Sequence, residues 1–573
     1  MISMKSILII LSFYSCSLFA QPAIISHRDI FTPVVATNGM VVTASPLASK
    51  AGVEVLKKGG NAVDAAVTVG LVMAVTYPRA GNIGGGGFML IDSVKSAGVV
   101  SIDYREKAPE KSFRDMFLDQ SGNPDYRLSQ FSHRSVGVPG TLAGFALALE
   151  KYGTISLAEA LKPAIKLAEE GFVVSVDFFK DIQRRAKRLK SWPATQAVFF
   201  KKGGGLYQVG ERFFQKDLAN TLRQVAKQGI SAFYQGKIAD LLVKDMQANQ
   251  GLMTKTDLQK YKAVLRKPIQ GKYRGYDVYS MAPPSSGGIH IVQMLNMLEA
   301  YNLNELGHNS AATIHLLTEV MKRAYADRSK HLGDPDFSTV EDQWLTSKAY
   351  AKQLVTSINS EKITPSEQIS PSLVPSYESD QTTHFSIVDK EGSVVSNTYT
   401  LNFSYGTGRI AKGTGILLNN EMDDFSIKPG VPNAYGLIGG ALNAVEPYKR
   451  MLSSMSPTIV KKNGQPVIVT GSPGGSRIIT TTLQVILNII DHRMNLQEAV
   501  NAVRIHHQWL PDKLRIEEGL SLDTLNVLKL MGYNPVNSNT MGATASILID
   551  YQKNLKIFHG ASDPRRSGLA VGY

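Results

Sequence analysis

Two adjacent threonines, Thr382 and Thr383, stand at the start of a predicted β-strand, two thirds of the way along this chain of 573 residues. A threonine hydroxyl inside a chain is a weak nucleophile. A threonine that becomes an N-terminus is activated by its own α-amine, whose pKa of about 7.7 to 8.0 lets it take the hydroxyl proton near neutral pH. Cleavage between Gln381 and Thr382 would therefore create a catalytic group, whereas an uncut Thr-Thr pair is simply typical of a strand.

A predicted hairpin positions this pair. Residues 383–388 alternate loosely between polar and apolar side chains, residues 389–392 have the composition of a turn, and a second strand covers 393–400. If Val388 faces Ser393, Thr382 lies opposite Tyr399, and a slip of one residue puts it opposite Thr400. In either register a hydroxyl cluster gathers at one end of the hairpin; its members are Thr382, Thr383, Thr398 and Thr400.

A glycine-rich loop, Gly-Ser-Pro-Gly-Gly-Ser-Arg at 471–477, lies between a predicted strand at 466–470 and a predicted helix at about 478–490. The pair Gly474 and Gly475 lets backbone N–H groups turn toward a ligand at a helix N-terminus, which suits a phosphate or the oxyanion of an acyl-transfer intermediate. No lysine follows in Walker spacing, so a nucleotide loop is disfavoured. A purely structural turn is the alternative interpretation.

An acidic segment, 419–425, concentrates three carboxylates within four positions: Glu421, Asp423 and Asp424. Such clustering is electrostatically costly unless a cation compensates it, so it predicts a metal or an ammonium group. The spacing of an EF-hand is absent, and His506 and His507 are adjacent, so their side chains point apart on a helix or a strand. Without a His-Glu-x-x-His motif or a cysteine ligand, we expect no metal.

Complementary groups for a carboxylate occur elsewhere. Ser453 and Ser454 offer paired hydroxyl donors, and Arg105 offers a two-pronged guanidinium. Together with the acidic segment they would hold an α-amino acid by both of its charges, although each residue taken singly is typical of an ordinary surface.

The residues above are expected to lie on helices and strands that do not follow the strict βαβ order typical of a parallel sheet. Helices are predicted from Ser45-Pro46 to Gly59, from Ala62 to Val75 behind an Asn61 cap, and from 160 to 170 behind a Ser156–Glu159 capping box. Further strands are predicted at 88–92, 99–104, 544–550 and 555–559. Residues from about 355 to 381 are polar and proline-bearing, which indicates a mobile linker that ends at Thr382.

Size and composition describe a globular protein. At 573 residues the chain predicts two or three structural units, unless two halves share one large sandwich. Its formal charge of +14 becomes +13 once Lys5 is removed with a signal peptide (14 − 1). The basic residues are dispersed, apart from a run at 184–190 that we interpret as a solvated helix face, and no nucleic-acid-binding motif accompanies them.

Residues 1–20 have the features of a secretory signal peptide: Lys5, an apolar run at 7–13, and Ala20 before the expected cut. Cys16, the single cysteine, lies in this segment, and a lipid-anchored cysteine is the alternative to simple removal. No later stretch approaches about 18 consecutive apolar residues, so no membrane span is expected. We therefore expect a periplasmic or secreted protein.

These residues, in this order, resemble the γ-glutamyltranspeptidases, also called glutathione hydrolases, of the N-terminal-nucleophile hydrolase superfamily. The resemblance runs from Gly39 to Tyr573. Its motifs are Thr-Thr-His-Phe-Ser at 382–386, Ser-Ser-Met-Ser-Pro-Thr at 453–458 and Gly-Ser-Pro-Gly-Gly-Ser at 471–476.

The resemblance implies an α+β fold, a four-layer αββα sandwich built from two autoprocessed subunits. The precursor would cut itself between Gln381 and Thr382 into a large subunit, 21–381, and a small subunit, 382–573, that stay together as a heterodimer. The resemblance makes Thr382 the nucleophile and Thr400 its hydrogen-bond partner, with Gly474 and Gly475 as the oxyanion hole. The remaining implied residues are Arg105, Ser453 and Ser454 for the α-carboxylate, Asn402, Glu421 and Asp424 for the α-amine, and Tyr435 as the gate of a lid loop.

The implied activity is cleavage of the γ-glutamyl amide of glutathione or glutamine through a γ-glutamyl-threonine ester, with transfer to water, amino acids or peptides and no cofactor. Some bacterial members carry glutamine where this chain has Glu421, and an acid there would tighten the grip on an ammonium group. One alternative is a β-lactam side-chain (glutaryl) acylase of the same fold, whose substrate lacks the α-amine that Glu421 and Asp424 would bind. Another is a processing-dead binding relative, against which the intact Thr382 and Thr400 argue.

Overall fold

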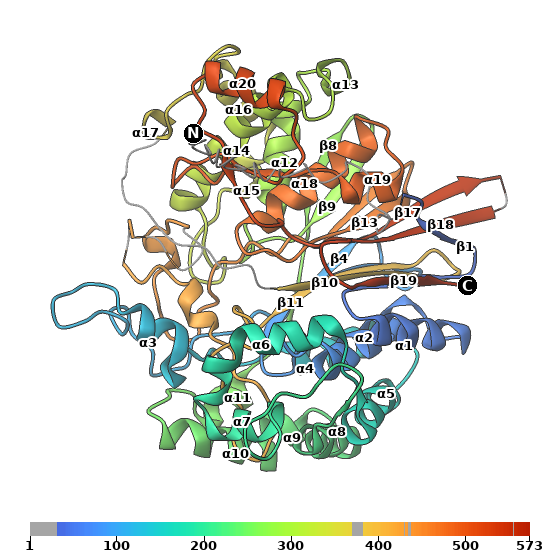
Figure 1. The fold of residues 1–573 in the computed structure, drawn as a ribbon, viewed down its shortest axis with the longest axis vertical. Coiled ribbons are helices and arrows are strands. Elements are labelled where there is room, and N and C mark those ends of the chain that lie inside the picture. The colour runs from blue at the N-terminus through green and yellow to red at the C-terminus, as the bar shows by residue number, and fades with distance from the viewer. Residues whose placement is uncertain (1–30, 370–381, 429, 432, 434–436, 554) are drawn as a thin grey trace, which may run out of the picture.

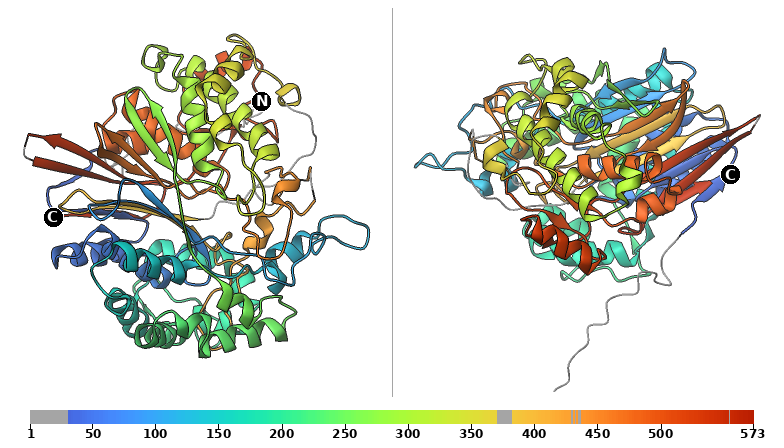
Figure 2. Two further views of the ribbon diagram at one scale, coloured as in Figure 1. Left: turned by 180° about the vertical axis from the view of Figure 1, so that it is seen from behind. Right: turned by 90° about the horizontal axis from the view of Figure 1, so that it is seen from above.

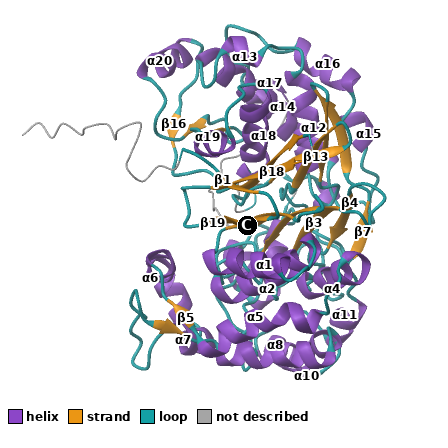
Figure 3. Ribbon diagram, turned by 90° about the vertical axis from the view of Figure 1, so that its right-hand side faces the viewer, coloured by secondary structure: helices purple, strands orange, loops and turns teal. Residues whose placement is uncertain are grey.

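The computed structural model describes residues 31–369, 382–428, 430–431, 433, 437–553 and 555–573, and within them a pair of seven-stranded sheets stack face to face. Helices cover the outer face of each sheet, which gives the layer order helix, sheet, sheet, helix (Figures 1 and 3). The α+β sandwich expected from the sequence is therefore confirmed.

The sheet that contains Thr383 is antiparallel, and its strands mix segments from before and after residue 382. In spatial order it consists of β19 (Leu569–Gly572), β2 (Met40–Thr43), β10 (Thr383–Val388), β11 (Val394–Thr400), β3 (Gly86–Asp92), β4 (Val100–Asp103) and β7 (Val264–Arg266). Every residue of β10 and β11 is buried. The hairpin predicted for this region is present, with the turn at 389–393.

The other sheet is also antiparallel. In spatial order it consists of β1 (Val34–Ala36), β18 (Leu555–Ser562), β17 (Ala545–Gln552), β13 (Gln465–Thr470), β12 (Thr458–Lys462), β9 (Tyr276–Ser280) and β8 (Ile269–Tyr273). Its β17–β18 hairpin extends past the helices at one edge of the molecule (Figure 2). Apolar side chains of both sheets, including Phe88, Leu90, Ile459 and Ile547, fill the space between the layers. Their burial fixes how the sheets stack.

The helices divide between the two outer layers. One layer holds α1 (Pro46–Lys57), α2 (Ala62–Thr76), α4 (Thr141–Tyr152), α5 (Leu157–Glu170), α6 (Val176–Lys190), α7 (Pro193–Phe199), α8 (Lys216–Gln228), α9 (Ser231–Tyr234), α10 (Lys237–Ala248) and α11 (Lys255–Lys260). The other holds α12 (Gly287–Leu298), α13 (Leu303–Leu306), α14 (Ala311–His331), α15 (Asp342–Leu345), α16 (Lys348–Thr356), α17 (Ser366–Ile369), α18 (Arg477–Ile490), α19 (Leu496–Asn501) and α20 (Leu522–Leu530). A short helix, α3 (Tyr126–Phe131), short strands at Phe172–Val173, Arg212–Phe213, Ile505–His506, Arg515–Ile516 and Val536–Asn537, and 3-10 helices at His133–Ser135, Glu421–Asp424 and Ala441–Asn443 complete the described elements.

The predicted caps explain where several helices begin. The Asn61 side chain accepts hydrogen bonds from the backbone N–H groups of Val63 and Asp64, and Ser156 and Glu159 form the predicted capping box before α5. Every residue of α2 is buried, as expected for a helix of small apolar residues packed on several sides. This helix lies directly under β10 and β11 and supports them.

Two sequence interpretations need correction. The segment from about 355 to 369 is not a mobile linker, because it contains α17 and is anchored by hydrogen bonds from Ile363 N to Met531 O and from Trp509 Nε1 to Ser366 O. Residues 370–381 lie outside the described residues. The basic run at 184–190 is only partly a solvated face, since Arg185 pairs with Asp181 at 2.5 Å and Arg188 donates to the carbonyl of Ser404.

Candidate active site

The hairpin register places Thr382 beside Thr400. Cα pairing runs from Val388 with Val394 to Thr383 with Tyr399, so the next residue outward, Thr382, faces Thr400. The hydroxyl oxygens of Thr382 and Thr400 lie 3.5 Å apart, and the Thr400 hydroxyl accepts a hydrogen bond of 2.9 Å from the backbone N–H of Asn402. Of the two registers left open by the sequence, the structure adopts the second. Thr382 is buried, with 4% of its surface exposed.

Glycines bring the neighbouring strand end unusually close to Thr400. A Cβ placed on Gly85 would lie 2.1 Å from the carbonyl oxygen of Thr400, and one on Gly86 would lie 2.4 Å from that of Tyr104. Such distances exclude any side chain at these positions. The glycine run at 84–87 therefore serves close backbone packing, and this packing holds the end of β11 in place.

The nearest imidazole does not supply a strong base. His384 is enclosed between Thr398 and Ser386, to which its ring nitrogens hydrogen-bond at 2.8 and 3.1 Å. Burial lowers the pKa of His384 to about 3. A Cβ on Gly471 would lie 2.5 Å from the ring, so glycine is required there. An α-amine at Thr382 would be a much stronger base than this histidine near neutral pH.

The glycine-rich loop ends at the N-terminus of α18. Gly474 and Gly475 adopt φ angles of +134° and +56°, which are strained for any other residue. Among the described residues no group accepts a hydrogen bond from the backbone N–H of either glycine. The helix begins at Arg477, so its positive end lies at this loop. The loop thus offers donors for an anion beside the cavity.

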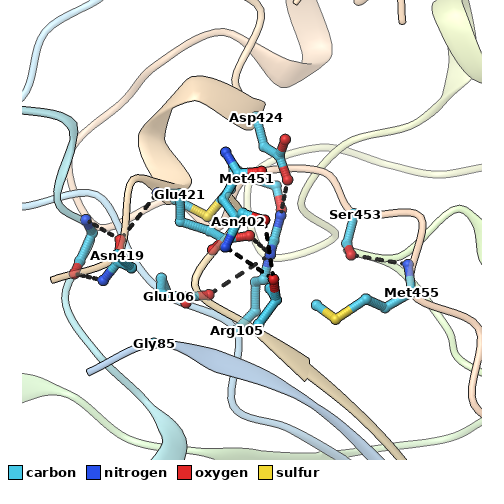
Figure 4. A network of polar contacts seen from close by, with 12 residues as sticks. Gly85, Arg105, Glu106, Asn402, Asn419, Glu421, Asp424, Met451, Ser453 and Met455 are labelled. Atoms are coloured by element: carbon cyan, nitrogen blue, oxygen red, sulfur yellow. Dashed lines mark hydrogen bonds and ion pairs between the residues drawn. The ribbon is translucent and has the colours of Figure 1, made fainter. Parts of the chain in front are cut away.

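A buried ionic cluster forms the opposite wall (Figure 4). The guanidinium of Arg105 contacts Glu421 and lies 2.5 Å from Oδ2 of Asp424 and 3.7 Å from Oε2 of Glu106. Its Nε also donates to the carbonyl of Met451 at 3.2 Å. Arg105 leaves the end of β4, whereas Glu421 and Asp424 lie on a 3-10 turn, Glu421–Asp424, so tertiary packing brings them together.

The protonation of this cluster is set by burial. Burial raises the pKa of Glu421 well above its ordinary value and that of Glu106 to about 7, although the charge of Arg105 opposes both shifts. Burial alone would lower the pKa of Arg105, but the carboxylates of Glu421 and Asp424 outweigh it and raise this pKa. Arg105 therefore stays charged, while burial favours the protonated form of both glutamates.

The serine pair lies on the same cavity with a second arginine. Ser453 accepts from the backbone N–H of Met455 at 3.1 Å, and Ser454 accepts from Nη2 of Arg328 at 3.3 Å. Nε of Arg328 donates to Ser286 at 3.0 Å, and burial lowers the pKa of Arg328 to about 10. Sequence reasoning missed Arg328 because it lies within the long helix α14, with no motif around it.

Thr382, Arg105 and the serine pair line one cavity of about 20 Å³, which has room for about one water molecule. The predicted residues on its wall are Arg105, Thr382, Thr400, Asn402, Glu421, Asp424, Ser453, Ser454 and Gly475. Gly474 adjoins it through the loop, and Leu437, Leu452 and Ile478 supply an apolar wall. Gln381 and Tyr435 lie outside the described residues.

No group of three or more potential metal ligands occurs in the described part of the chain. His506 hydrogen-bonds Thr480 and Gln508, while the adjacent His507 hydrogen-bonds Asp512, so the two rings have different partners. The same part of the chain holds no helix of the length and apolar character that crossing a bilayer requires.

Comparisons with known proteins identify the family of this chain. The family model described as gamma-glutamyltranspeptidase matches residues 48–573. The chain is 53% identical over 549 residues to a glutathione hydrolase proenzyme of Escherichia coli (strain K12), covering 96% of this chain and 94% of that protein. It is 48% identical over 567 residues to a glutathione hydrolase proenzyme of Pseudomonas sp. (strain A14), covering 98% and 97%.

A solved structure, the cephalosporin acylase of Bacillus halodurans, superposes with a TM-score of 0.84 at 27% identity, over 95% of this chain and 97% of that one. Proteins named for different reactions thus share this sandwich fold, so the fold alone does not identify the family. The family model and the more similar relatives do identify it. This chain belongs to the γ-glutamyltranspeptidase family.

Proposed function

We propose that this protein is made as a precursor that cuts itself between Gln381 and Thr382, and that the product is a γ-glutamyl transferase and hydrolase acting on glutathione, glutamine and related γ-glutamyl compounds. The observation that carries the proposal is the single cavity in which the Thr382 hydroxyl, the Gly475 backbone and the Arg105–Asp424 pair meet. Relatives named glutathione hydrolase proenzyme support both the activity and the self-cleavage.

In the proposed substrate complex, the zwitterionic end of the γ-glutamyl group replaces internal contacts of the cluster. Its α-carboxylate takes the guanidinium of Arg105 and the hydroxyls of Ser453 and Ser454, and its α-ammonium takes Asp424, Glu421 and the side chain of Asn402. One internal ion pair, Arg105–Asp424, is exchanged for two ion pairs with the substrate, so the buried charges stay compensated. A cavity of about 20 Å³ requires these side chains to separate as the substrate enters.

The proposed chemistry has two steps. The Thr382 oxygen attacks the γ-carbonyl carbon while the hydroxyl proton passes to the α-amine of Thr382, and the backbone N–H groups at Gly474 and Gly475 stabilise the oxyanion. The C–N bond then breaks, the leaving amine takes the proton, and a γ-glutamyl ester remains on Thr382. Water or an amine attacks the ester, gives its proton to the same α-amine, and releases the threonine. Thr400 holds the nucleophile in line.

We further propose that cleavage leaves a large subunit, 21–381, and a small subunit, 382–573, associated as a heterodimer. β10 pairs with β2 and β11 pairs with β3, so strands from the two fragments alternate in one sheet. Separating the fragments would expose these strand edges and the apolar layer beneath them. We assign residues 1–20 to a signal peptide, which lies outside the described residues, and place the protein in the periplasm or outside the cell.

The acylase alternative is less well supported. Its glutaryl substrate carries no α-ammonium, which would leave the buried carboxylate of Glu421 and the partly buried carboxylate of Asp424 without a substrate partner. Relatives named Acylase ACY 1 proenzyme are also more distant than the glutathione hydrolase proenzyme of Escherichia coli, at 39% identity against 53%. A processing-dead binding protein would have no need of the Thr382–Thr400 contact or of the strained glycine pair.

One denaturing gel tests the proposal. We expect the purified protein to give two bands, of about two thirds and one third of the mass, and N-terminal sequencing of the smaller band to begin at Thr382. Thr382→Ala removes the hydroxyl proposed to attack both the Gln381–Thr382 peptide bond and the γ-glutamyl amide of the substrate. This variant should therefore give one band and turn over no γ-glutamyl-p-nitroanilide. Two bands from Thr382→Ala would reject the self-cleavage scheme.

A further inference from the structure

Ser476, the residue that follows the strained pair of glycines, is held at two points. Its backbone carbonyl accepts a hydrogen bond from the hydroxyl of Tyr325, and its own hydroxyl donates to Oε1 of Gln508 at 2.7 Å. All three residues are buried. We call Tyr325 and Gln508 together the Ser476 clamp.

The two residues of the clamp are themselves held in place by histidines. The ring of His506 lies edge-on to that of Tyr325, with the centroids 5.8 Å apart, and the ring of His290 stacks on Tyr325 at 6.1 Å. Nε2 of His506 also lies 2.9 Å from Oε1 of Gln508. Because an amide oxygen only accepts hydrogen bonds, His506 donates here, and Gln508 accepts from both His506 and Ser476. The tyrosine ring and the amide therefore have little freedom to turn.

The glycine-rich loop is also fixed on the other side of the glycine pair. The hydroxyl of Ser472 accepts a hydrogen bond from the backbone N–H of Ala543 at 3.1 Å. The carbonyls of Gly474 and Gly475 accept from N–H groups of the first turn of α18, at 3.0 and 3.3 Å. Backbone in rarely populated conformations persists only where the surrounding structure holds it. The glycine pair thus lies between two anchors, and the Ser476 clamp is one of them.

The clamp connects the two fragments of the proposed precursor. Tyr325 lies on α14, before the proposed cut, whereas Ser476 and Gln508 lie after it. A hydrogen bond from the large fragment therefore sets the position of a loop in the small fragment. One turn further along α14, Arg328 donates to Ser454. A single helix thus contacts both the glycine-rich loop and the serine pair.

We propose that Tyr325 and Gln508 are positioning residues of the reaction, which act through Ser476. By holding this residue they keep the backbone N–H groups of the glycine pair aimed at the point where the oxyanion forms. This inference depends on the proposed function. The clamp should matter in both chemical steps, because each passes through an oxyanion. The α-amino acid end of the substrate is held by other groups and should not be affected by the clamp.

The test begins with Tyr325→Phe and Gln508→Met, which remove the hydrogen-bonding groups of the clamp and keep side chains of similar size. Removing an oxyanion donor outright lowers kcat by about 100-fold to 1,000-fold. In these variants the donors remain but are less well aimed, so we expect kcat for γ-glutamyl-p-nitroanilide, per mole of cleaved enzyme, to fall about tenfold in each. Because both steps use the same donors, KM should stay within about twofold of the wild type.

Two inhibitors distinguish positioning from general damage to the site. In the first, a boronic acid group replaces the γ-carboxyl group of glutamate. Its boron bonds the Thr382 oxygen, the hydroxyl proton passes to the α-amine of Thr382, and the tetrahedral boronate carries the negative charge of the oxyanion. The second, norvaline, has the same α-amino acid end and no polar group that could reach the glycine pair. In both variants the Ki of the boronic acid should rise about tenfold and that of norvaline should change less than about twofold.

A matched control is Tyr533→Phe. The hydroxyl of this buried tyrosine hydrogen-bonds His315 and Glu319, both on α14, at 2.7 and 3.4 Å, and it makes no contact with Ser476. This variant should keep the kcat and both Ki values of the wild type, even if its Tm falls. A wild-type kcat in either clamp variant would overturn the inference, and so would equal rises of the two Ki values. Failure of the proposed function looks different, because the wild type would then release no p-nitroaniline at all.

Discussion

Replacing Asp424 by asparagine tests how the cluster selects its substrate. Asparagine keeps the shape of the side chain but removes the negative charge that lies 2.5 Å from Nη2 of Arg105. Arg105 keeps its contact with Glu421, so the fold retains a partner for the guanidinium. The group that loses an ion pair is the ammonium of the bound substrate.

The size of the effect follows from burial. A hydrogen bond to a charged group contributes about 1.5–3 kcal/mol, and breaking a buried ion pair costs about 3–5 kcal/mol when the other charge stays unpaired. Glu421 still faces the ammonium in the proposed complex, so we expect the variant to lose about 2–3 kcal/mol of transition-state stabilisation. This loss corresponds to a fall in kcat/KM of about 30-fold to 150-fold. Precursor cleavage should be unaffected, because the cut bond carries no α-amino acid end.

The assay compares γ-glutamyl-p-nitroanilide with glutaryl-p-nitroanilide, which lacks the α-amine. In the variant, kcat/KM should fall for the first compound and stay the same or rise for the second, so that the preference for the amine collapses. A gel that shows both fragments and an unchanged Tm exclude misfolding. Equal losses on both compounds, or an undiminished preference, would refute the assignment of Asp424 to the ammonium.

Two further outcomes are expected. Thr400→Val removes the hydroxyl that lies 3.5 Å from that of Thr382 and should slow precursor cleavage and turnover by about twofold to tenfold. Thr400→Ser should restore precursor cleavage on a time-course gel and turnover in the γ-glutamyl-p-nitroanilide assay. Full activity in the valine variant would show that the Thr400 hydroxyl does not assist Thr382. Burial raises the pKa of Glu106 to about 7, above its value in the unfolded chain, so the folded state binds the extra proton and Glu106 contributes stability below about pH 4.5 that is lost as pH rises toward 7. Glu106→Gln should therefore flatten the fall of Tm between pH 5 and pH 8, and an unaltered Tm profile would show that Glu106 does not titrate there.

Much of the local structure follows from neighbouring residues. The Asn61 cap, the Ser156–Glu159 capping box and the turn after Val388 each depend on a few adjacent side chains, so their positions are readable from the sequence. The hairpin register was left open between two choices. In the structure β10 also pairs with β2 and β11 also pairs with β3, so segments far from the hairpin take part in fixing its register.

Predictions from the sequence are wrong where contacts with distant segments determine the local structure. The basic run on α6 matches a solvated face by spacing, yet the carbonyl of Ser404, 216 residues away in sequence, accepts a hydrogen bond from Arg188 and draws it inward. The polar tract after residue 355 has the composition of a linker, yet two residues far away in sequence anchor it. Trp509 donates a hydrogen bond to the carbonyl of Ser366, and the carbonyl of Met531 accepts one from the backbone N–H of Ile363. Composition cannot report such partners.

The order of residues alone predicted which groups could carry the chemistry: a threonine at a strand start, a glycine pair before a helix, and acids, hydroxyls and an arginine suited to an amino acid. These are local patterns, so each of them can be recognised from a few neighbouring residues. Tertiary structure alone decided that Arg105 and Asp424 share one cavity with Thr382 and that Arg328 joins them. Those relations are long-range because the two sheets and their outer helices bring together side chains that are hundreds of residues apart, and burial then sets their charges.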